Sequence, residues 1–333
     1  MRRPELTALR GRESQRRARR RPRVARVDIL RHLLSETPPT SPIDSPRACF
    51  DLLEPLDSTF QSTVDRAAAG GFIADRLGYA FLAGYRAALT RLDPKVRRAS
   101  LCATESAGPH PRAISTRLRQ SSDPNFHVLT GEKTFATLAS VAETLLVVAS
   151  VGEKEGRNQL VVARVPAGRA GVVIRDREPL AFAPEIPHAR VTFADVRVAP
   201  EEVLDGDGYE RLLKPFRTIE DVHVTAASLG HIVRVARLYG EPREIVERSL
   251  ASLSALRELA THDPLDPALH VALAGVLAEA AAVAQRLELG AADEAIRARW
   301  ARDLPLLGVA GAVRELRREA AHRVFGPQKT PAP

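Results

Sequence analysis

The first third of the chain carries a hydrophobic pattern of helical spacing. Within 77–92, apolar residues recur every three or four positions, which marks one buried stripe of an α-helix. The stripe consists of Leu77, Phe81, Tyr85, Ala88 and Leu92. Because a residue that precedes proline disfavours helical geometry, Asp93-Pro94 should end this helix. We predict an N-terminal helical region over 35–98, which opens with a Pro/Ser-rich linker at 36–46.

The middle of the chain changes to short runs rich in Val and Leu, separated by Gly, Pro, Asn and Asp. Such runs are typical of β-strands. Six of them occur, at 100–104, 126–131, 144–150, 159–165, 171–175 and 189–198. No long helical pattern separates them, which disfavours a parallel doubly wound sheet. We predict a middle β domain over 99–205, folded as a small barrel or sandwich.

Helical periodicity returns in the last third of the chain. Four long segments show it, at 212–238, 242–261, 267–289 and 291–325. The third begins with Asp266-Pro267, a capping residue followed by a proline at the first helical position, and should end at Gly290. Ala-rich faces favour close helix packing. We predict a C-terminal helical bundle over 206–333, and an α+β multidomain fold for the whole chain.

The net charge of +8 is concentrated near the N-terminus. Residues 1–32 hold twelve Arg against Glu5, Glu13 and Asp28, so the rest of the chain is close to neutral. We predict a basic, disordered tail over 1–34, because so few apolar residues cannot bury enough surface to fold. Clustered arginines also suit an arm that binds nucleic acid, which is the alternative interpretation.

The composition is that of an ordinary globular protein, with 44% hydrophobic and 27% charged residues. We find no run of about 18 apolar residues and therefore expect no transmembrane helix and no membrane partner. The tail has no apolar core of signal-peptide type, and the two cysteines cannot build a disulfide framework. These features favour a reducing cytoplasm. Of the two, Cys102 lies in a strand-like run, where we expect it to be packed and not nucleophilic.

Common catalytic motifs such as a phosphate-binding loop or a zinc-protease signature do not occur in the sequence. One metal-binding arrangement is conceivable. Glu220 and His223, like Glu319 and His322, form Glu-x-x-His pairs at a spacing that places both side chains on one helix face. Di-iron bundles use two such pairs. A metal-binding helical bundle is therefore a lesser alternative.

Four stretches resemble acyl-CoA dehydrogenases, in the order and at the intervals that this family shows. The first, 101–108 (LCATESAG), is similar to the family's "cvTEPgaGSD", and the second, 130–137 (TGEKTFAT), to its "NGeKxWIT". The third, 191–200 (VTFADVRVAP), is similar to "vxFddVrVP", and the fourth, 203–206 (VLDG), stands where the family has "vLG". The resemblance covers about 75–235. It implies short N-terminal helices, a β barrel and a C-terminal helical bundle.

The resemblance also implies a site for FAD on the middle β domain. By position, Leu101, Ala103 and Thr104 would line the isoalloxazine ring, Phe135 would support it, and Thr137 would hydrogen-bond near its N5 atom. An aromatic face and a hydroxyl group suit these roles. Taken without the family, Phe135 and Thr137 can equally be ordinary residues of a strand.

A carboxylate base is the other requirement of the family's reaction, which removes an α-proton while a hydride leaves the β-carbon. The segment 218–230 is similar to "LERxxxAxxxxG" of isovaleryl- and long-chain acyl-CoA dehydrogenases, and it places Glu220 on the catalytic Glu. The alternative is a surface Glu in the first turn of a helix, where the helix dipole favours it. Asp221 stands where the family has Arg, and the family's "RxxFG" and "QxxGGxGY" segments, which help to hold FAD across a subunit interface, have no counterpart.

We therefore predict an FAD-dependent oxidoreductase that dehydrogenates an acyl thioester at its α,β-bond. By resemblance, we also expect a homo-oligomer. A catalytically degenerate homologue that acts as a binding or structural protein is the main alternative. The acyl chain and the electron acceptor are not readable from these residues.

Overall fold

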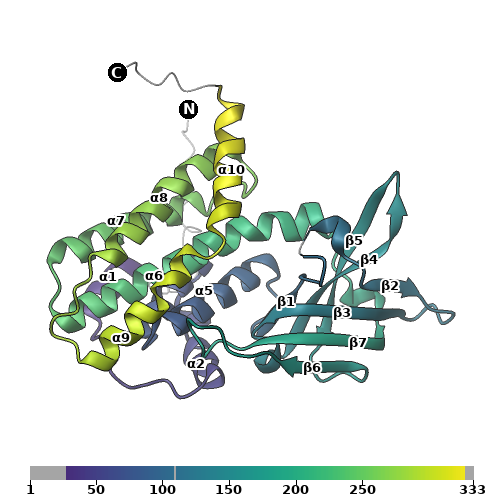
Figure 1. Ribbon diagram of the computed structural model, residues 1–333, viewed down its shortest axis with the longest axis horizontal. Helices are drawn as coiled ribbons and strands as arrows, with labels where there is room; N and C mark the ends of the chain where they lie inside the picture. Colours follow the sequence, from purple (N-terminus) through teal and green to yellow (C-terminus); the bar gives the residue numbers. More distant parts are fainter. Residues whose placement is uncertain (1–27, 109, 327–333) are drawn as a thin grey trace, which may run out of the picture.

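The computed structural model describes residues 28–108 and 110–326. A block of helices makes up one side of the molecule, and a curved β-sheet makes up the other (Figure 1). The chain passes through N-terminal helices, the sheet and a C-terminal helical region in that order, which confirms the predicted fold class.

Five helices precede the sheet. They are α1 (Ile29–Ser35), α2 (Pro46–Leu53), α3 (Leu56–Thr59), α4 (Thr63–Ile73) and α5 (Leu77–Leu92). The last ends at Leu92 with Asp93 as its C-cap, as the Asp93-Pro94 pair predicts. The predicted single stripe on α5 is wrong, since the helix is buried almost all round between its neighbours.

The boundary of the basic tail is corrected by α1. Residues 1–27 of the predicted tail lie outside the described residues, but 28–34 are folded. The Asp28 carboxylate caps α1 by accepting hydrogen bonds from the backbone N–H groups of Leu30 (2.8 Å) and Arg31 (3.1 Å). Ile29 and Leu33, one turn apart, are fully buried. The surrounding arginines concealed this short apolar pattern in the sequence.

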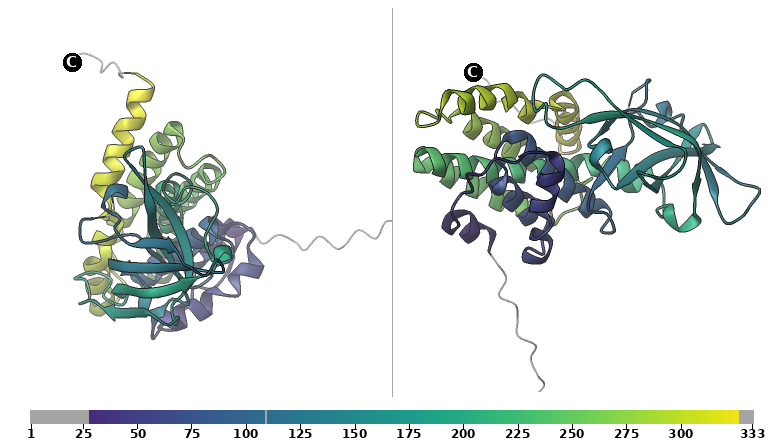
Figure 2. Two further views of the ribbon diagram at one scale, coloured as in Figure 1. Left: turned by 90° about the vertical axis from the view of Figure 1, so that its right-hand side faces the viewer. Right: turned by 90° about the horizontal axis from the view of Figure 1, so that it is seen from below.

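The β domain is a seven-stranded mixed sheet that curls into a half-barrel (Figure 2). Its strands are β1 (Ala99–Cys102), β2 (Arg117–Gln120), β3 (His127–Thr137), β4 (Thr144–Lys154), β5 (Arg157–Pro166), β6 (Val172–Asp176) and β7 (His188–Val198). The order is β1-β4-β2-β3-β7-β6, with β5 also paired to β4. β1 runs parallel to β4, whereas β3, β7 and β6 are antiparallel.

Two features of the sheet were missed in the sequence. The strand β2 has the sequence RLRQ, of which only Leu118 is buried, so it shows no hydrophobic run. The strand β3 extends to Thr137, six residues beyond the predicted end at 131, because partly buried polar residues continue it. Cys102 is fully buried in β1, and burial raises the pKa of its thiol to about 12, which confirms a packed cysteine.

Five helices follow the sheet. They are α6 (Lys214–Tyr239), α7 (Arg243–Leu259), α8 (Pro267–Gln285), α9 (Glu294–Asp303) and α10 (Gly311–Val324). The predicted fourth helix over 291–325 is wrong, because Pro305 and a left-handed Ala310 (φ 66°) separate α9 from α10. Asp266 caps α8 as predicted, but the helix ends at Gln285 and not at Gly290.

The helix α8 also corrects the expectation of no membrane-spanning pattern. It has 19 residues with a mean hydropathy of 1.6, so by length and composition alone it could cross a membrane. In the structure it packs on α6, α7 and α10 and buries Leu269, Leu273 and Val283. A bundle helix of a soluble protein passes the same test, so this observation is weak evidence for a membrane.

The helices α4, α5 and α6 pack so closely that glycines are required between them. A Cβ atom at Gly71 of α4 would lie 1.8 Å from the Ala227 carbonyl oxygen of α6, and one at Gly230 would lie 2.0 Å from the Ala68 oxygen. The long helix α6 therefore lies directly against the N-terminal helices, with the later C-terminal helices on another side (Figure 2). Its first residues reach the β domain (Figure 1).

Candidate functional site

The two segments that carry the predicted cofactor residues lie side by side. Beyond β1, Thr104 pairs with Phe135 of β3 as an isolated bridge. The Thr134 N–H donates to the Thr104 carbonyl oxygen at 2.9 Å, and the Ser100 hydroxyl donates to the Thr137 carbonyl oxygen at 2.7 Å. Residues about thirty positions apart in the chain thus form one surface.

A buried ion pair joins the two segments that form this surface. The Lys133 ammonium of β3 lies 2.6 Å from a Glu105 carboxylate oxygen, and both side chains are almost completely buried. The carboxylate also accepts hydrogen bonds from Ser115 and from the Thr116 N–H. Burial alone would raise the pKa of Glu105, but the bonds from Lys133 and Ser115 outweigh it and lower this pKa to about 2. This pair was not predicted from the sequence, although both residues belong to the stretches 101–108 and 130–137 that resemble the family.

The backbone N–H groups of Ala103 and Thr104 are candidate hydrogen-bond donors for a ligand. Neither donates in a turn or loop hydrogen bond within the described residues, although Thr104 forms the bridge with Phe135. Ala103 is only 8% exposed, and a buried N–H group without a partner is rare. A ring with carbonyl oxygens along one edge would satisfy these donors. The Leu101 N–H, in contrast, already donates to the Tyr85 hydroxyl at 3.0 Å.

His188, the first residue of β7, contacts both remaining cofactor candidates. Its ring stacks on Phe135 with 4.3 Å between the ring centroids, and its Nδ1 lies 3.2 Å from the Thr137 hydroxyl. Burial, with a smaller effect from Arg177, lowers the pKa of His188 to about 4, so its imidazole is neutral at pH 7. His188 was not predicted from the sequence; its place just before the 191–200 stretch is the signal that could have found it.

Glu220 lies in the second turn of α6, since that helix begins at Lys214. The alternative of a surface residue in the first turn is therefore wrong. The side chain is partly buried, and burial followed by repulsion from Asp221 raises the pKa of its carboxyl group to about 7. Burial, followed by the Glu220 charge, raises the pKa of Tyr85, whose hydroxyl accepts a hydrogen bond from the Leu101 N–H. The charge of the candidate base thus acts on a tyrosine that contacts the candidate cofactor surface.

Asp221 serves a structural purpose. One carboxylate oxygen lies 2.8 Å from Arg314 Nε, and the other pairs with Arg317, both on α10. Arg317 also donates to the Thr218 hydroxyl at 3.1 Å. Because both Asp221 oxygens bind arginines of α10, this carboxylate holds α10 against α6. It is therefore poorly placed to act as a second base.

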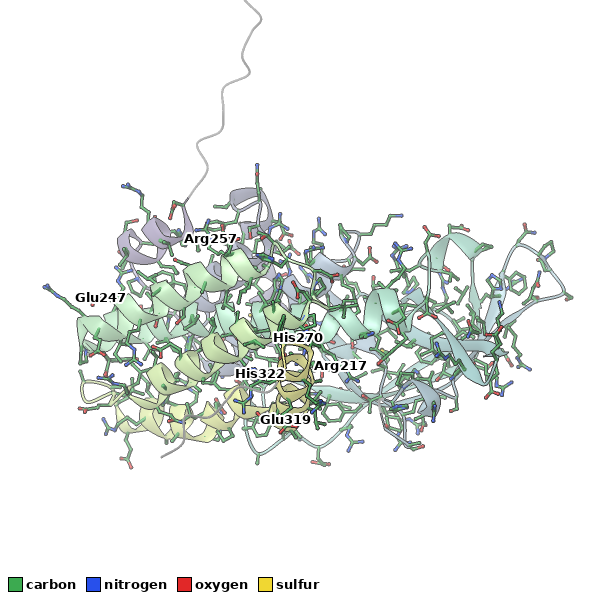
Figure 3. All side chains as sticks on the ribbon, turned by 90° about the horizontal axis from the view of Figure 1, so that it is seen from above. Arg217, Glu247, Arg257, His270, Glu319 and His322 are labelled. Atoms are coloured by element: carbon green, nitrogen blue, oxygen red, sulfur yellow. The ribbon has the colours of Figure 1, made fainter. Side chains whose placement is uncertain are left out.

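The metal-binding alternative is not supported. Both ring nitrogens of His223 are already engaged, with the Thr63 hydroxyl at 2.8 Å and the Ile219 carbonyl oxygen at 2.7 Å. The other pair, Glu319 and His322, lies on α10 (Figure 3). No group of three or more potential metal ligands occurs within 28–108 and 110–326.

Comparisons with known proteins match this architecture. Residues 100–196 match the description "Acyl-CoA dehydrogenase, middle domain". The butyryl-CoA dehydrogenase of Megasphaera elsdenii has a similar structure, with a TM-score of 0.66 and 15% sequence identity, over 89% of this chain and 98% of that one.

Two further solved structures are similar. One is an FAD-dependent dehydrogenase, with a TM-score of 0.60 and 16% identity over 79% of this chain and 84% of that one. The other is the prolyl acyl carrier protein oxidase AnaB, with a TM-score of 0.56 and 14% identity over 84% and 90%. A search of curated proteins returns no match. At these identities, the structural similarity concerns the fold.

Proposed function

Because the chain belongs to the acyl-CoA dehydrogenase family, by its middle domain and its fold, we propose that it is an FAD-dependent oxidoreductase that introduces a double bond into an acyl thioester. The observation that carries the proposal is Glu220. Its carboxyl group combines a pKa near 7 with a charge that acts on Tyr85, whose hydroxyl accepts a hydrogen bond from the Leu101 N–H of the candidate cofactor surface. A base with such a pKa is matched to proton abstraction at neutral pH.

The donor set at Ala103 and Thr104 fits the cofactor. Their backbone N–H groups and the Thr104 hydroxyl would hold the carbonyl edge of the flavin ring, and the Glu105–Lys133 pair keeps this segment in place. Phe135 and Thr137 would flank the ring, with His188 fixing both side chains. Bound FAD supplies an acceptor for the hydride that leaves the substrate's β-carbon.

The protein's own part in the reaction is proton removal. The Glu220 carboxylate takes the proton from the α-carbon, and the electron pair of that C–H bond becomes the second bond between the α- and β-carbons as the hydride departs. The partial burial of Glu220 withholds water from the carboxylate and so keeps it basic. After turnover, the protonated carboxyl group must return its proton to solvent.

The visible spectrum of the purified protein tests the proposal. We expect flavin absorbance, retained after dialysis or restored by added FAD, and bleaching of that absorbance by an acyl-CoA such as butyryl-CoA without oxygen. A protein that stays colourless in excess FAD would instead support the degenerate homologue. A flavoprotein that no acyl thioester bleaches would contradict the substrate class.

Asp221 should influence the pH at which Glu220 loses its proton, and therefore the pH dependence of the reaction rate. The negative charge of Asp221 raises the Glu220 pKa, whereas Arg314 and Arg317 lower it. In Asp221→Asn the repulsion is lost and the two arginines remain, so the pKa should fall and the acidic limb of the pH–rate profile should move down by about one unit or more. Asp205→Asn, which removes the same charge at an exposed position, is the control. An unchanged limb in Asp221→Asn would count against Glu220 as the titrating group.

A further inference from the structure

A cavity of about 120 Å³ lies in the helical part, where the linker before α2, the beginning of α5, the second half of α6 and α9 meet. Arg234 of α6 lines it, fourteen residues beyond Glu220, which corresponds to about 21 Å along the helix. One wall is formed by His231 and Trp300, whose rings stack with 6.0 Å between their centroids. The cavity shares no residue with the candidate catalytic site.

Arg234 is a buried cation that forms no ion pair within the described residues. Its residue is 5% exposed, and its Nε and Nη2 atoms donate to the Pro39 carbonyl oxygen at 3.1 and 2.6 Å. Within the part of the chain that the structure describes, no carboxylate forms an ion pair with it. A neutral carbonyl satisfies two N–H donors but does not neutralise the charge, which Asp75 offsets only from beyond ion-pair distance. A buried charge of this kind is costly.

A second guanidinium group lines the same cavity. Arg299 of α9 is partly buried and makes no side-chain hydrogen bond or ion pair with a described residue. Burial lowers the pKa of Arg234, Tyr239 and Asp75 raise it, and Arg299 lowers it by a smaller effect. The two guanidinium groups therefore repel each other across the cavity, and an anion between them would relieve this repulsion.

The acidic residues of the cavity cannot supply this anion. Asp75 is bound by Arg76 at 2.7 Å and by the Ile43 N–H at 3.2 Å. Asp303 is bound by Arg302 at 2.7 Å and by the Ala183 N–H at 2.7 Å. Each carboxylate is therefore paired with an arginine of its own. Asp75 also attracts Arg234 and Arg299, but it forms no ion pair with either, so their positive charge is offset only in part.

We propose that this cavity is a binding site for a small oxyanion, a phosphate or carboxylate group, held between Arg234 and Arg299. Guanidinium groups bind both oxyanions through paired N–H donors. A volume of about 120 Å³ accommodates a group of this size and is well below the volume of typical sites for larger ligands. The bound anion connects the linker, α6 and α9, since Pro39, Arg234 and Arg299 belong to these three segments.

The test is anion binding to the full chain. Inorganic phosphate and acetate are titrated separately at constant ionic strength, with chloride as the reference, and binding is followed by calorimetry and by the melting temperature. We expect one of the two anions to bind at a single saturable site and to raise the melting temperature, and the tighter one identifies the oxyanion. If phosphate and acetate each change the melting temperature by no more than chloride does, the proposal is overturned.

Two variants of α9 locate the site. Arg299→Gln should weaken anion binding by about tenfold or more, because one charge-assisted contact is lost. Arg297→Gln removes the same charge on the exposed side of the same helix and should bind like the parent. Because Arg299 is only partly buried, its variant should fold, which circular dichroism verifies. Unchanged affinity in a folded Arg299→Gln protein would contradict the proposal, even if Arg234→Gln fails to fold.

Discussion

Replacing Glu220 with Gln should slow flavin reduction by an acyl thioester about a hundredfold or more. Glutamine keeps the size and the hydrogen-bonding shape of the side chain but cannot accept the α-proton. Because Glu220 is proposed to touch only the substrate, the variant should retain the flavin spectrum of the parent. Stopped-flow bleaching of the flavin absorbance measures the effect directly.

The control for this variant is Glu247→Gln, on the outer surface of α7 (Figure 3). It removes the same charge and should react like the parent. A Glu220→Gln protein that reduces flavin at the parental rate would reject the assignment of the base. In the double variant Glu220→Gln/Asp221→Asn we expect no larger loss of activity than the first substitution causes, since Asp221 is held by two arginines.

The pH dependence follows from the same carboxyl group. The base must be deprotonated, and its pKa is raised to about 7. The rate should therefore be highest above pH 7 and fall about tenfold for each unit below it. With an ordinary carboxyl group, whose pKa is near 4.5, the rate would not change between pH 8 and about pH 5. The pH–rate profile therefore distinguishes a buried base from an exposed one.

Gly71→Ala should lower the free energy of unfolding by about 3 kcal/mol. Its new Cβ atom would lie 1.8 Å from the Ala227 carbonyl oxygen, so α4 and α6 must move apart. Because both atoms are close to the backbone, no side-chain rotation can relieve the contact. Urea denaturation followed by circular dichroism measures the loss.

The matched control is Gly275→Ala, in the middle of α8, where an added Cβ would meet no atom within 4 Å. This change should stabilise the protein by about 0.5–1 kcal/mol, because alanine has the higher helix propensity. If Gly71→Ala is as stable as the parent, the close packing of α4 on α6 at this glycine is contradicted.

Local patterns in the sequence were sufficient for the fold class. The helical stripe before Asp93-Pro94, the Val-rich runs and the Asp266 cap each depend on residues close in the chain, and each corresponds to an element of the structure. The predictions failed where apolar content was low or hidden by charge, at α1 and β2, and where one Pro-containing turn divides α9 from α10.

The residues of the candidate site were likewise predicted only in part. Resemblance of short stretches was enough to select Glu220, Leu101, Ala103, Thr104, Phe135 and Thr137, whose roles stay predictions. It did not select His188 or the Glu105–Lys133 pair, because these act through partners that are tens of residues away in the chain.

The sequence by itself thus determined the order of the helical and β regions, and its resemblance to a family determined the choice of candidate residues. Only the tertiary structure decided which charges are compensated. Asp221 and Arg234 are both charged residues of one helix. Asp221 forms ion pairs with two arginines, whereas Arg234 forms no ion pair within the described residues and donates to a carbonyl oxygen. The physical reason is that the energy of a charge depends on burial and on neighbours brought by distant segments, and neither is visible in a local pattern.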